Sequence, residues 1–191
     1  MDYIITALIS YLFGSIPFGY IFTKIFLKKD IRDVGSGNIG ATNVLRTGNK
    51  RLGYLTLILD ILKAVIPVIY VKLYYPDLIF ISALCAFLGH LFPVWLKFDG
   101  GKGVATFVGI LISINIYYAL IFGIIWVLTF IISKYSSLSS LIASISIPIY
   151  ILILDNGNFI FFTIMFVLIF YTHRENIKRL INKEETKSKI Y

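Results

Sequence analysis

Long apolar segments recur along the chain from Tyr3 to the low 170s, and they decide what it can fold into. They cover approximately residues 3–26, 53–74, 78–97, 104–118, 119–133, 138–154 and 158–172. A helix of about 20 apolar residues crosses a hydrocarbon core of roughly 30 Å. The run from 104 to 133 is too long for one crossing, so Ser113 and Asn115 near its middle favour a tight hairpin. We therefore predict an all-α integral membrane protein with about seven transmembrane helices, forming one domain over residues 1–191.

The composition supports lipid as the main solvent of this chain. Hydrophobic residues make up 58% of it and charged residues 15%, whereas soluble domains are roughly half apolar and a quarter charged. The single cysteine, Cys85, excludes an intrachain disulfide and a cysteine-based metal cluster. We expect no metal and no other cofactor.

Lysine and arginine are distributed very unevenly over the connections. Seven lie within residues 24–51, two within 97–102, one at 134 and six within 174–189, which is 16 of the 18. Because cytoplasmic connections carry the excess of these residues, we place the N-terminus outside the cell and the C-terminus in the cytoplasm. The opening residues lack the positive region of a cleavable signal, so the first segment is expected to remain as a helix. Anionic lipid and an anionic substrate account for the net charge of +8, without nucleic acid.

The first predicted cytoplasmic loop is rich in glycine and in hydrogen-bond donors. It contains a formal G-x-G-x-x-G, but a dinucleotide fingerprint needs a preceding strand, and here membrane helices lie on both sides. Glycines let amides converge on an anion, a short helix from Ala41 would add its N-terminal amides, and Arg46 can bind two phosphate oxygens. A plain polar linker is the simpler alternative, but it does not require donors interleaved with glycine. The candidate phosphate-binding residues are Gly35, Ser36, Gly37, Asn38, Gly40, Ala41, Thr42, Asn43 and Arg46.

A second glycine-rich loop precedes the fourth apolar segment. It is not a Walker A loop, because Leu96 stands where a glycine is needed and Gly103 replaces the Ser or Thr after Lys102. Glycines around a lysine at the start of a helix still form a compact positive site suited to phosphate. His90 is interpreted as a packing residue. Lys97 is interpreted as a side chain that extends to the membrane–water interface. The candidate binding residues here are Gly100, Gly101, Lys102 and Gly103.

A third polar segment follows the last apolar run. His173, Asn176, Ile177 and Leu180 share one helix face, while Arg174, Glu175 and Lys178 face elsewhere. We expect His173 and Asn176 to point inward to the site. The stretch after Arg179 is interpreted as an amphipathic tail held by anionic lipid.

Two further polar features are less specific. Asp60 and Lys63 lie one turn apart inside the second apolar segment, where charge is costly, and are expected to pair or to face the interior. Ser140 belongs to a serine-rich turn on the predicted cytoplasmic side. It is interpreted as either a ligand of a substrate head group or a helix-capping residue.

Three short stretches of the chain carry a family resemblance. They are Gly-Ser-Gly-Asn-Ile-Gly-Ala-Thr-Asn-Val-Leu-Arg at 35–46, Gly-His-Leu-Phe-Pro-Val-Trp with Gly-Gly-Lys-Gly-Val-Ala-Thr at 89–106, and His-Arg-Glu-Asn-Ile-Lys-Arg at 173–179. Together they resemble the signatures of the bacterial acyl-phosphate:glycerol-3-phosphate acyltransferases, over nearly the whole chain. The resemblance implies transfer of a fatty acyl group from acyl phosphate to glycerol 3-phosphate in the bacterial cell membrane, giving lysophosphatidic acid and phosphate. It implicates Ser36, Arg46, Lys102, His173 and Asn176 in catalysis, the backbone of 40–43 in phosphate binding, and Ser140 as an addition.

The residues themselves agree with this chemistry on one independent point. Acyltransferases that use acyl coenzyme A depend on a histidine with an aspartate five positions later. Trp95 follows His90 at that distance and Lys178 follows His173, so that pair is absent. The resemblance likewise implies that neither coenzyme A nor acyl carrier protein takes part directly.

We expect direct attack of a glycerol 3-phosphate hydroxyl on the acyl-phosphate carbonyl, since no activated nucleophile is evident. Lys102 and the glycine loops would stabilise the leaving phosphate. Either His173 or a substrate phosphate would take the proton, and Ser36 would serve as an oxyanion donor or as a nucleophile. The alternative function is a membrane carrier for a small phosphorylated anion, whose ligands belong near the midplane. The expected partners are the two substrates and membrane lipid, with no obligate protein partner.

Overall fold

The computed structural model describes residues 2–154 and 158–187, and all regular structure in these ranges is helical. Lys189, counted above in the basic tail, lies outside the described residues. Internal contacts divide the chain into two compact units, Met1–Ile114 and Asn115–Tyr191. An all-α fold is therefore confirmed, while the single domain stays a prediction.

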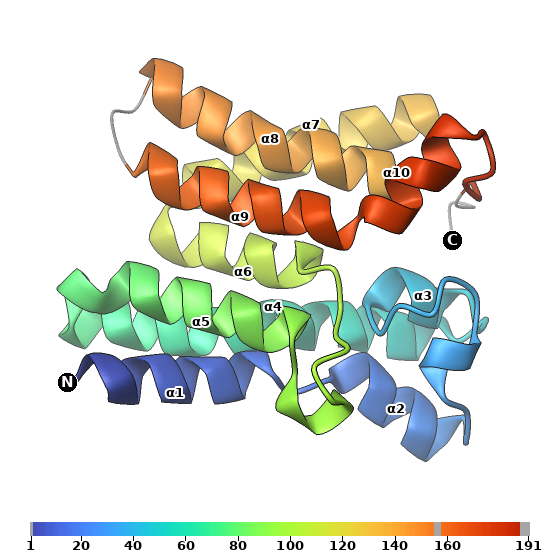
Figure 1. The fold of residues 1–191 in the computed structure, drawn as a ribbon, viewed down its shortest axis with the longest axis horizontal. Helices are drawn as coiled ribbons and strands as arrows, with labels where there is room; N and C mark the ends of the chain where they lie inside the picture. Colours follow the sequence, from blue (N-terminus) through green and yellow to red (C-terminus); the bar gives the residue numbers. More distant parts are fainter. Residues whose placement is uncertain (1, 155–157, 188–191) are drawn as a thin grey trace. The chain divides into compact units, whose positions relative to one another are not determined.

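The first unit is built on long helices that run alongside one another (Figure 1). Helix α1 packs along α5, and α4 packs against both α5 and α6. Helices α1 and α5 can approach closely because Gly14 and Gly89 have no side chain. A Cβ at Gly14 would overlap the backbone of Ala86, and one at Gly89 would overlap the carbonyl oxygen of Tyr11. The helices are α1 (Tyr3–Gly14), α2 (Phe18–Phe26), α3 (Ala41–Leu45), α4 (Lys50–Tyr74), α5 (Ile79–Leu91) and α6 (Val104–Ile114). Three 3-10 turns join them: η1 (Ile31–Asp33), η2 (Pro76–Leu78) and η3 (Val94–Leu96).

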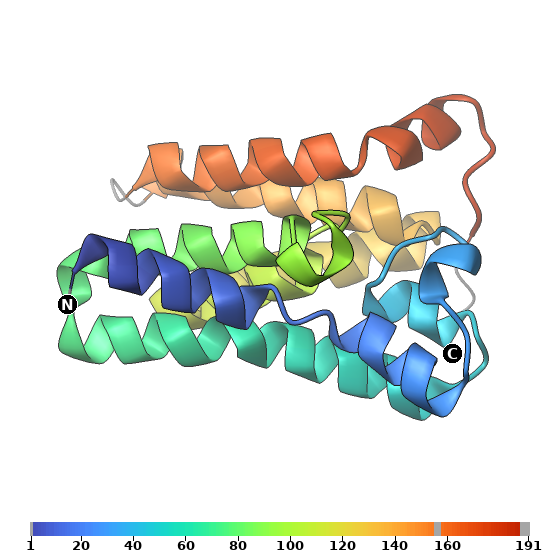
Figure 2. The ribbon, with the colours of Figure 1, turned by 60° about the horizontal axis from the view of Figure 1, so that its bottom comes forward.

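The first apolar segment is broken, where a continuous helix was expected. Helix α1 ends at Gly14 and α2 begins at Phe18. Pro17, directly before α2, has no N–H to donate and cannot continue a helical ladder. The break leaves α2 and the loop after it at one end of the unit, as Figure 2 also shows.

The second unit packs α8 against both α7 and α9. Its interior holds Ile147, Ile151, Met165 and Ile169, all buried. After α9 the chain bends by 62° into α10, visible as the red helices in Figure 2. The helices are α7 (Ile116–Ser133), α8 (Ser136–Leu154), α9 (Phe159–Thr172) and α10 (Arg174–Ile181).

Five helical segments in the described ranges are long and apolar enough to cross a membrane, or six if α9 and α10 form one bent span. Helix α6, with 11 residues, is shorter than a full crossing. Large apolar side chains such as Leu73, Ile132 and Ile160 stand exposed on the outer faces, as lipid contact requires. The count of about seven helices and the orientation stay predictions.

The break expected between residues 104 and 133 is present. Helix α6 ends at Ile114, and Asn115 caps α7 by accepting the N–H of Tyr117 at 3.0 Å. The tight hairpin predicted at that point stays a prediction.

Candidate active site

The first glycine-rich loop is organised around the buried side chain of Asn43. Its Nδ2 lies within hydrogen-bonding distance of the carbonyl oxygens of Ile31 (3.1 Å), Val34 (2.8 Å) and Asn38 (2.9 Å). Its Oδ1 accepts the N–H of Ser36 at 3.0 Å. Asn43 was predicted to bind substrate, but its side-chain donors and acceptor are used inside the loop. The side-chain amide of Asn43 thus fixes the path of the loop. Ser36 lies exposed in this loop.

Two glycines make the turn possible, as the sequence predicted. Gly35 and Gly37 have φ of +57° and +72°, in the left-handed region that suits glycine. A Cβ on Gly35 would lie 3.1 Å from Cδ of Arg46, so the arginine side chain packs directly beside the residue before Ser36. The structure therefore brings Ser36 and Arg46 together at one loop.

The predicted short helix is confirmed as α3, which starts at Ala41. The N–H groups of Asn43 and Val44 donate to the carbonyl oxygen of Gly40. The amides of Ala41 and Thr42, which precede those bonds in the helix, have no acceptor within α3. They are the amides that this helix can offer to an anion.

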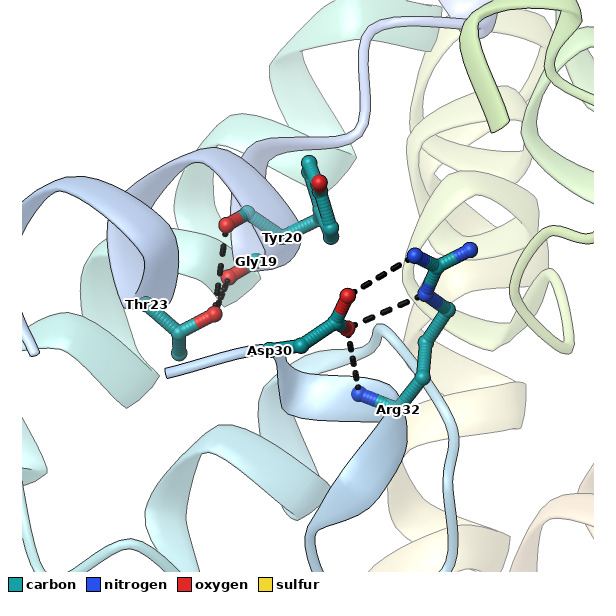
Figure 3. A network of polar contacts seen from close by, with 5 residues as sticks. All are labelled: Gly19, Tyr20, Thr23, Asp30 and Arg32. Atoms are coloured by element: carbon teal, nitrogen blue, oxygen red, sulfur yellow. Dashed lines mark hydrogen bonds and ion pairs between the residues drawn. The ribbon is translucent and has the colours of Figure 1, made fainter. Parts of the chain in front are cut away.

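An ion pair anchors the entrance of the first loop beside α2 (Figure 3). Asp30 accepts from the Nε and Nη2 of Arg32 at 3.0 and 2.8 Å and from its backbone N–H at 3.0 Å. The hydrogen bond from Arg32 lowers the pKa of Asp30 to about 2, and the carboxylate in turn raises the pKa of Arg32. The guanidinium also lies 5.2 Å from the ring centre of Tyr20, so the pair is fixed to α2.

The second glycine-rich loop is packed against the end of α5. The N–H of Gly101 donates to the carbonyl oxygen of His90 at 3.0 Å. A Cβ on Gly101 would overlap Nε2 of the His90 ring, and one on Gly103 would overlap the ring of Phe87. Glycine is therefore needed at both positions for the loop to pack this closely against α5. Lys102 lies between the two glycines and is half-buried. His90 is buried, as predicted, and its packing partner is this loop.

The two loops share one hydrophobic cluster. Leu96, from the turn before the second loop, packs with Ile31, Ile39 and Val44 of the first loop region. Leu52 of α4 completes the buried set. The loop that carries Ser36 and Arg46 and the loop that carries Lys102 are therefore parts of one packed assembly.

In the second unit, His173 lies at the junction of α9 and α10 and is buried. Its Nδ1 is 2.8 Å from the carbonyl oxygen of Ile169. A carbonyl oxygen can only accept, so Nδ1 carries the proton of this hydrogen bond. Helix α10 has the buried face that was expected: Asn176 is buried within the second unit, whereas Arg174 and Lys178 are exposed. That this face points to the substrate site stays a prediction.

Glu185 is a residue of this segment that the sequence interpretation missed. Its carboxylate accepts from Ser137 at 2.9 Å, from Asn176 at 2.7 Å and from Nε of Arg179 at 2.7 Å. Burial raises the pKa of Glu185, but the hydrogen bonds from Arg179, Asn176 and Ser137 outweigh it, so the pKa lies below its ordinary 4.5. The interpretation of the stretch after Arg179 as a lipid-bound tail is therefore wrong at Glu185.

The remaining candidates have plain structural surroundings. The hydroxyl of Ser140 donates to the carbonyl oxygen of Ser136 at 2.9 Å and accepts from Trp126 Nε1 at 3.1 Å. Asp60 and Lys63 form the expected buried ion pair at 2.8 Å. Among the described residues, no group of three His, Cys, Asp or Glu side chains is arranged to hold a metal ion.

Two solved structures share this fold. Both are crystal structures of PlsY (YgiH), an integral membrane glycerol 3-phosphate acyltransferase, one in a glycerol 3-phosphate form and one in a lysophosphatidic acid form. The first superposes with a TM-score of 0.90 at 36% identity, covering 97% of this chain and 94% of that one. The second gives 0.88 at 35% identity over the same shares. The class of protein is therefore an integral membrane acyltransferase.

Sequence relatives narrow this class. A glycerol-3-phosphate acyltransferase of Pelagibacter ubique is 73% identical over the full length of both chains. One of Rhodopseudomonas palustris is 50% identical over 98% of this chain and 95% of its own. The family model for glycerol-3-phosphate acyltransferase matches residues 4–183. The chain belongs to the glycerol-3-phosphate acyltransferase family, which leaves the carrier alternative without support.

Proposed function

We propose that this acyltransferase moves a fatty acyl group from acyl phosphate to glycerol 3-phosphate, releasing lysophosphatidic acid and inorganic phosphate at the cytoplasmic face. The observation that carries the proposal is the packing of two glycine loops, one with Ser36 and Arg46 and one with Lys102, on one hydrophobic cluster. Both substrates bear phosphate. Glycine loops with cations suit such groups, and the two solved relatives are a glycerol 3-phosphate form and a lysophosphatidic acid form.

In the proposed reaction, a hydroxyl oxygen of glycerol 3-phosphate forms a bond to the acyl carbonyl carbon. The bond from that carbon to the phosphate oxygen breaks, and its electron pair leaves with phosphate. Lys102 and the amides of the first loop would stabilise the negative charge that develops on the leaving group. Arg46 would hold a substrate phosphate, and the hydroxyl of Ser36 would donate to the carbonyl oxygen as it becomes negative.

The proton of the attacking hydroxyl needs an acceptor. His173 would suit this role as a neutral imidazole, because Nδ1 donates to Ile169 and Nε2 would then be the basic nitrogen of the ring. A substrate phosphate, with a second pKa of about 6, could take the proton instead. The side chain of Asn176 donates a hydrogen bond to Glu185, which fixes its orientation. In this position it would orient the substrate. The convergence of His173 and Asn176 with the loops of the first unit stays a prediction, as does Ser140 as a ligand.

The test is acyl transfer by the purified protein. Supplied with acyl phosphate and glycerol 3-phosphate, it should release phosphate and form lysophosphatidic acid in equal amounts, whereas acyl coenzyme A should give no product. Lys102→Met should lower kcat by a factor of about 100, the effect of removing one group that stabilises the transition state. Lys97→Met is the matched control, because Lys97 lies exposed on the same loop. Near-normal turnover of the Lys102 variant would remove it from the site, and use of acyl coenzyme A would refute the proposed donor.

A further inference from the structure

An ion pair that the reaction does not use is buried inside the first unit. Nζ of Lys63 lies 2.8 Å from Oδ1 of Asp60, and the two side chains are 1% and 3% exposed. Charges within a membrane span are costly to keep, and they are retained where they serve a purpose. Lys63 also contacts Ile16, near the first glycine-rich loop, and Asp60 lies near His90, which contacts the second.

Lys63 is connected to the break between α1 and α2. Its Nζ donates at 2.8 Å to the carbonyl oxygen of Ile16, which also accepts the N–H of Phe18 at 3.2 Å across the break. From this break, α2 runs to the first loop. A Cβ on Gly19 of α2 would overlap the carbonyl oxygen of Ile39, so the helix and the loop touch at backbone level. The position of Ile16 therefore helps to set the position of the Ser36 loop.

Asp60 is connected to the second loop. Its Oδ1 faces Nδ1 of His90 on α5 at 3.9 Å, a buried contact that is too long for a hydrogen bond. The carbonyl oxygen of His90 accepts the N–H of Gly101 at 3.0 Å, and its ring fills the space beside that glycine. The residue after Gly101 is Lys102. The ion pair thus stands between the two loops, with Lys63 toward the first and Asp60 toward the second.

We propose that the Asp60–Lys63 pair is a positioning unit that holds the Ser36 loop and the Lys102 loop at a fixed separation. The proposal rests on the proposed function only in taking these loops as the substrate site. Each loop keeps its own internal bonds without the pair, so binding of either phosphate should persist. What is lost is the relative placement of the loops, which matters most in the transition state, where a shift of about 1 Å can cost a factor of about 100.

The test replaces the pair by apolar residues of similar size, in the double variant Asp60→Leu with Lys63→Met. Removing one partner alone would leave a buried charge and threaten folding, whereas removing both is often neutral for stability. The matched control is Lys72→Met on the same helix. Lys72 also donates to backbone carbonyls, of Ser113 at 2.8 Å and Ile114 at 3.0 Å.

Two readouts separate positioning from general destabilisation. The double variant should lower kcat by a factor of about 10 to 100 while KM for glycerol 3-phosphate changes less than about threefold, and Lys72→Met should leave both unchanged. Spin labels on cysteines at Asp33 and Lys97, both exposed, report the separation of the loops in a Cys85→Ala background. The distance distribution should broaden or shift in the double variant alone.

A folded double variant whose label distances match those of the unmodified protein overturns the proposal, even if acyl phosphate proves not to be the donor. A fall in kcat that follows the loss of thermal stability equally in the double variant and in Lys72→Met overturns it as well.

Discussion

Asn43 shows how much of a site can depend on one side chain. It is buried, and it bonds to the backbone at four points of the first loop. Leaving buried carbonyl groups without a donor costs about 1 to 3 kcal/mol each. The geometry around Ser36 is therefore maintained by a residue that need not touch a substrate.

Asn43→Ala should reduce acyl transfer by at least about tenfold and destabilise the protein by about 1 to 3 kcal/mol, because the loop carbonyls lose their shared donor. The control is Asn49→Ala. Asn49 accepts the N–H of Leu52 at 3.1 Å as the cap of α4, and its loss should cost about 1 kcal/mol with activity kept. Thermal unfolding and initial rates, measured on both variants, check the prediction. Equal activity of the two variants would contradict it.

At this scale the sequence predicted residue types better than their orientation. Glycines, Arg46 and Lys102 were selected as candidate site residues because charge and glycine spacing are visible in the sequence, and their roles stay predictions. Asn43 was grouped with the binding residues because nothing in a sequence shows whether an amide faces a ligand or the loop itself. His90 is buried, as predicted, but its contact with Gly101 comes from chain segments that only folding brings together.

At the scale of the element, α10 is held by Glu185 as well as by its apolar face. The carboxylate lies beyond the end of the helix and bonds back to Asn176 and Arg179 of α10 and to Ser137 of α8. The spacing of His173, Asn176, Ile177 and Leu180 was enough to predict the inward face. A return contact from a flanking segment has no periodicity, so the sequence did not reveal it.

The stability that Glu185 contributes should depend on pH. Its folded pKa lies below the ordinary 4.5, so the ionised form is favoured in the folded state. The contribution is complete above about pH 5 and is lost as the pH falls through the lowered folded value. The difference in melting temperature between the unmodified protein and Glu185→Gln should therefore shrink on acidification below about pH 4.5. Glu184→Gln, one residue away and exposed, serves as control and should show no such difference.

At the scale of the whole molecule, hydropathy predicted the membrane class but not the helix ends. The segment 3–26 is one span by composition and two helices in the structure, because a single proline ends the ladder. The segment from 104 divides at Asn115, as its polar residues suggested, and leaves α6 with only 11 residues. Such divisions depend on local hydrogen bonding, which average hydropathy does not register.

The orientation inferred from the basic residues can be tested across α4, whose two ends lie near Lys50 and Asp77. Single cysteines at these exposed positions, in a Cys85→Ala background, would be treated with a membrane-impermeant maleimide on intact cells. Because cytoplasmic loops carry the positive charge, Asp77→Cys should label and Lys50→Cys should label only after permeabilisation. The reverse pattern would put the glycine loops outside.

The division at residue 114 bears on the order in which the protein is made. A ribosome synthesises the first unit before it begins α7. The bonds of Asn43, the packing of Leu96 and the contact of His90 with Gly101 all lie inside that unit. A nascent chain can therefore finish shaping both glycine loops while the codon for His173 is still untranslated.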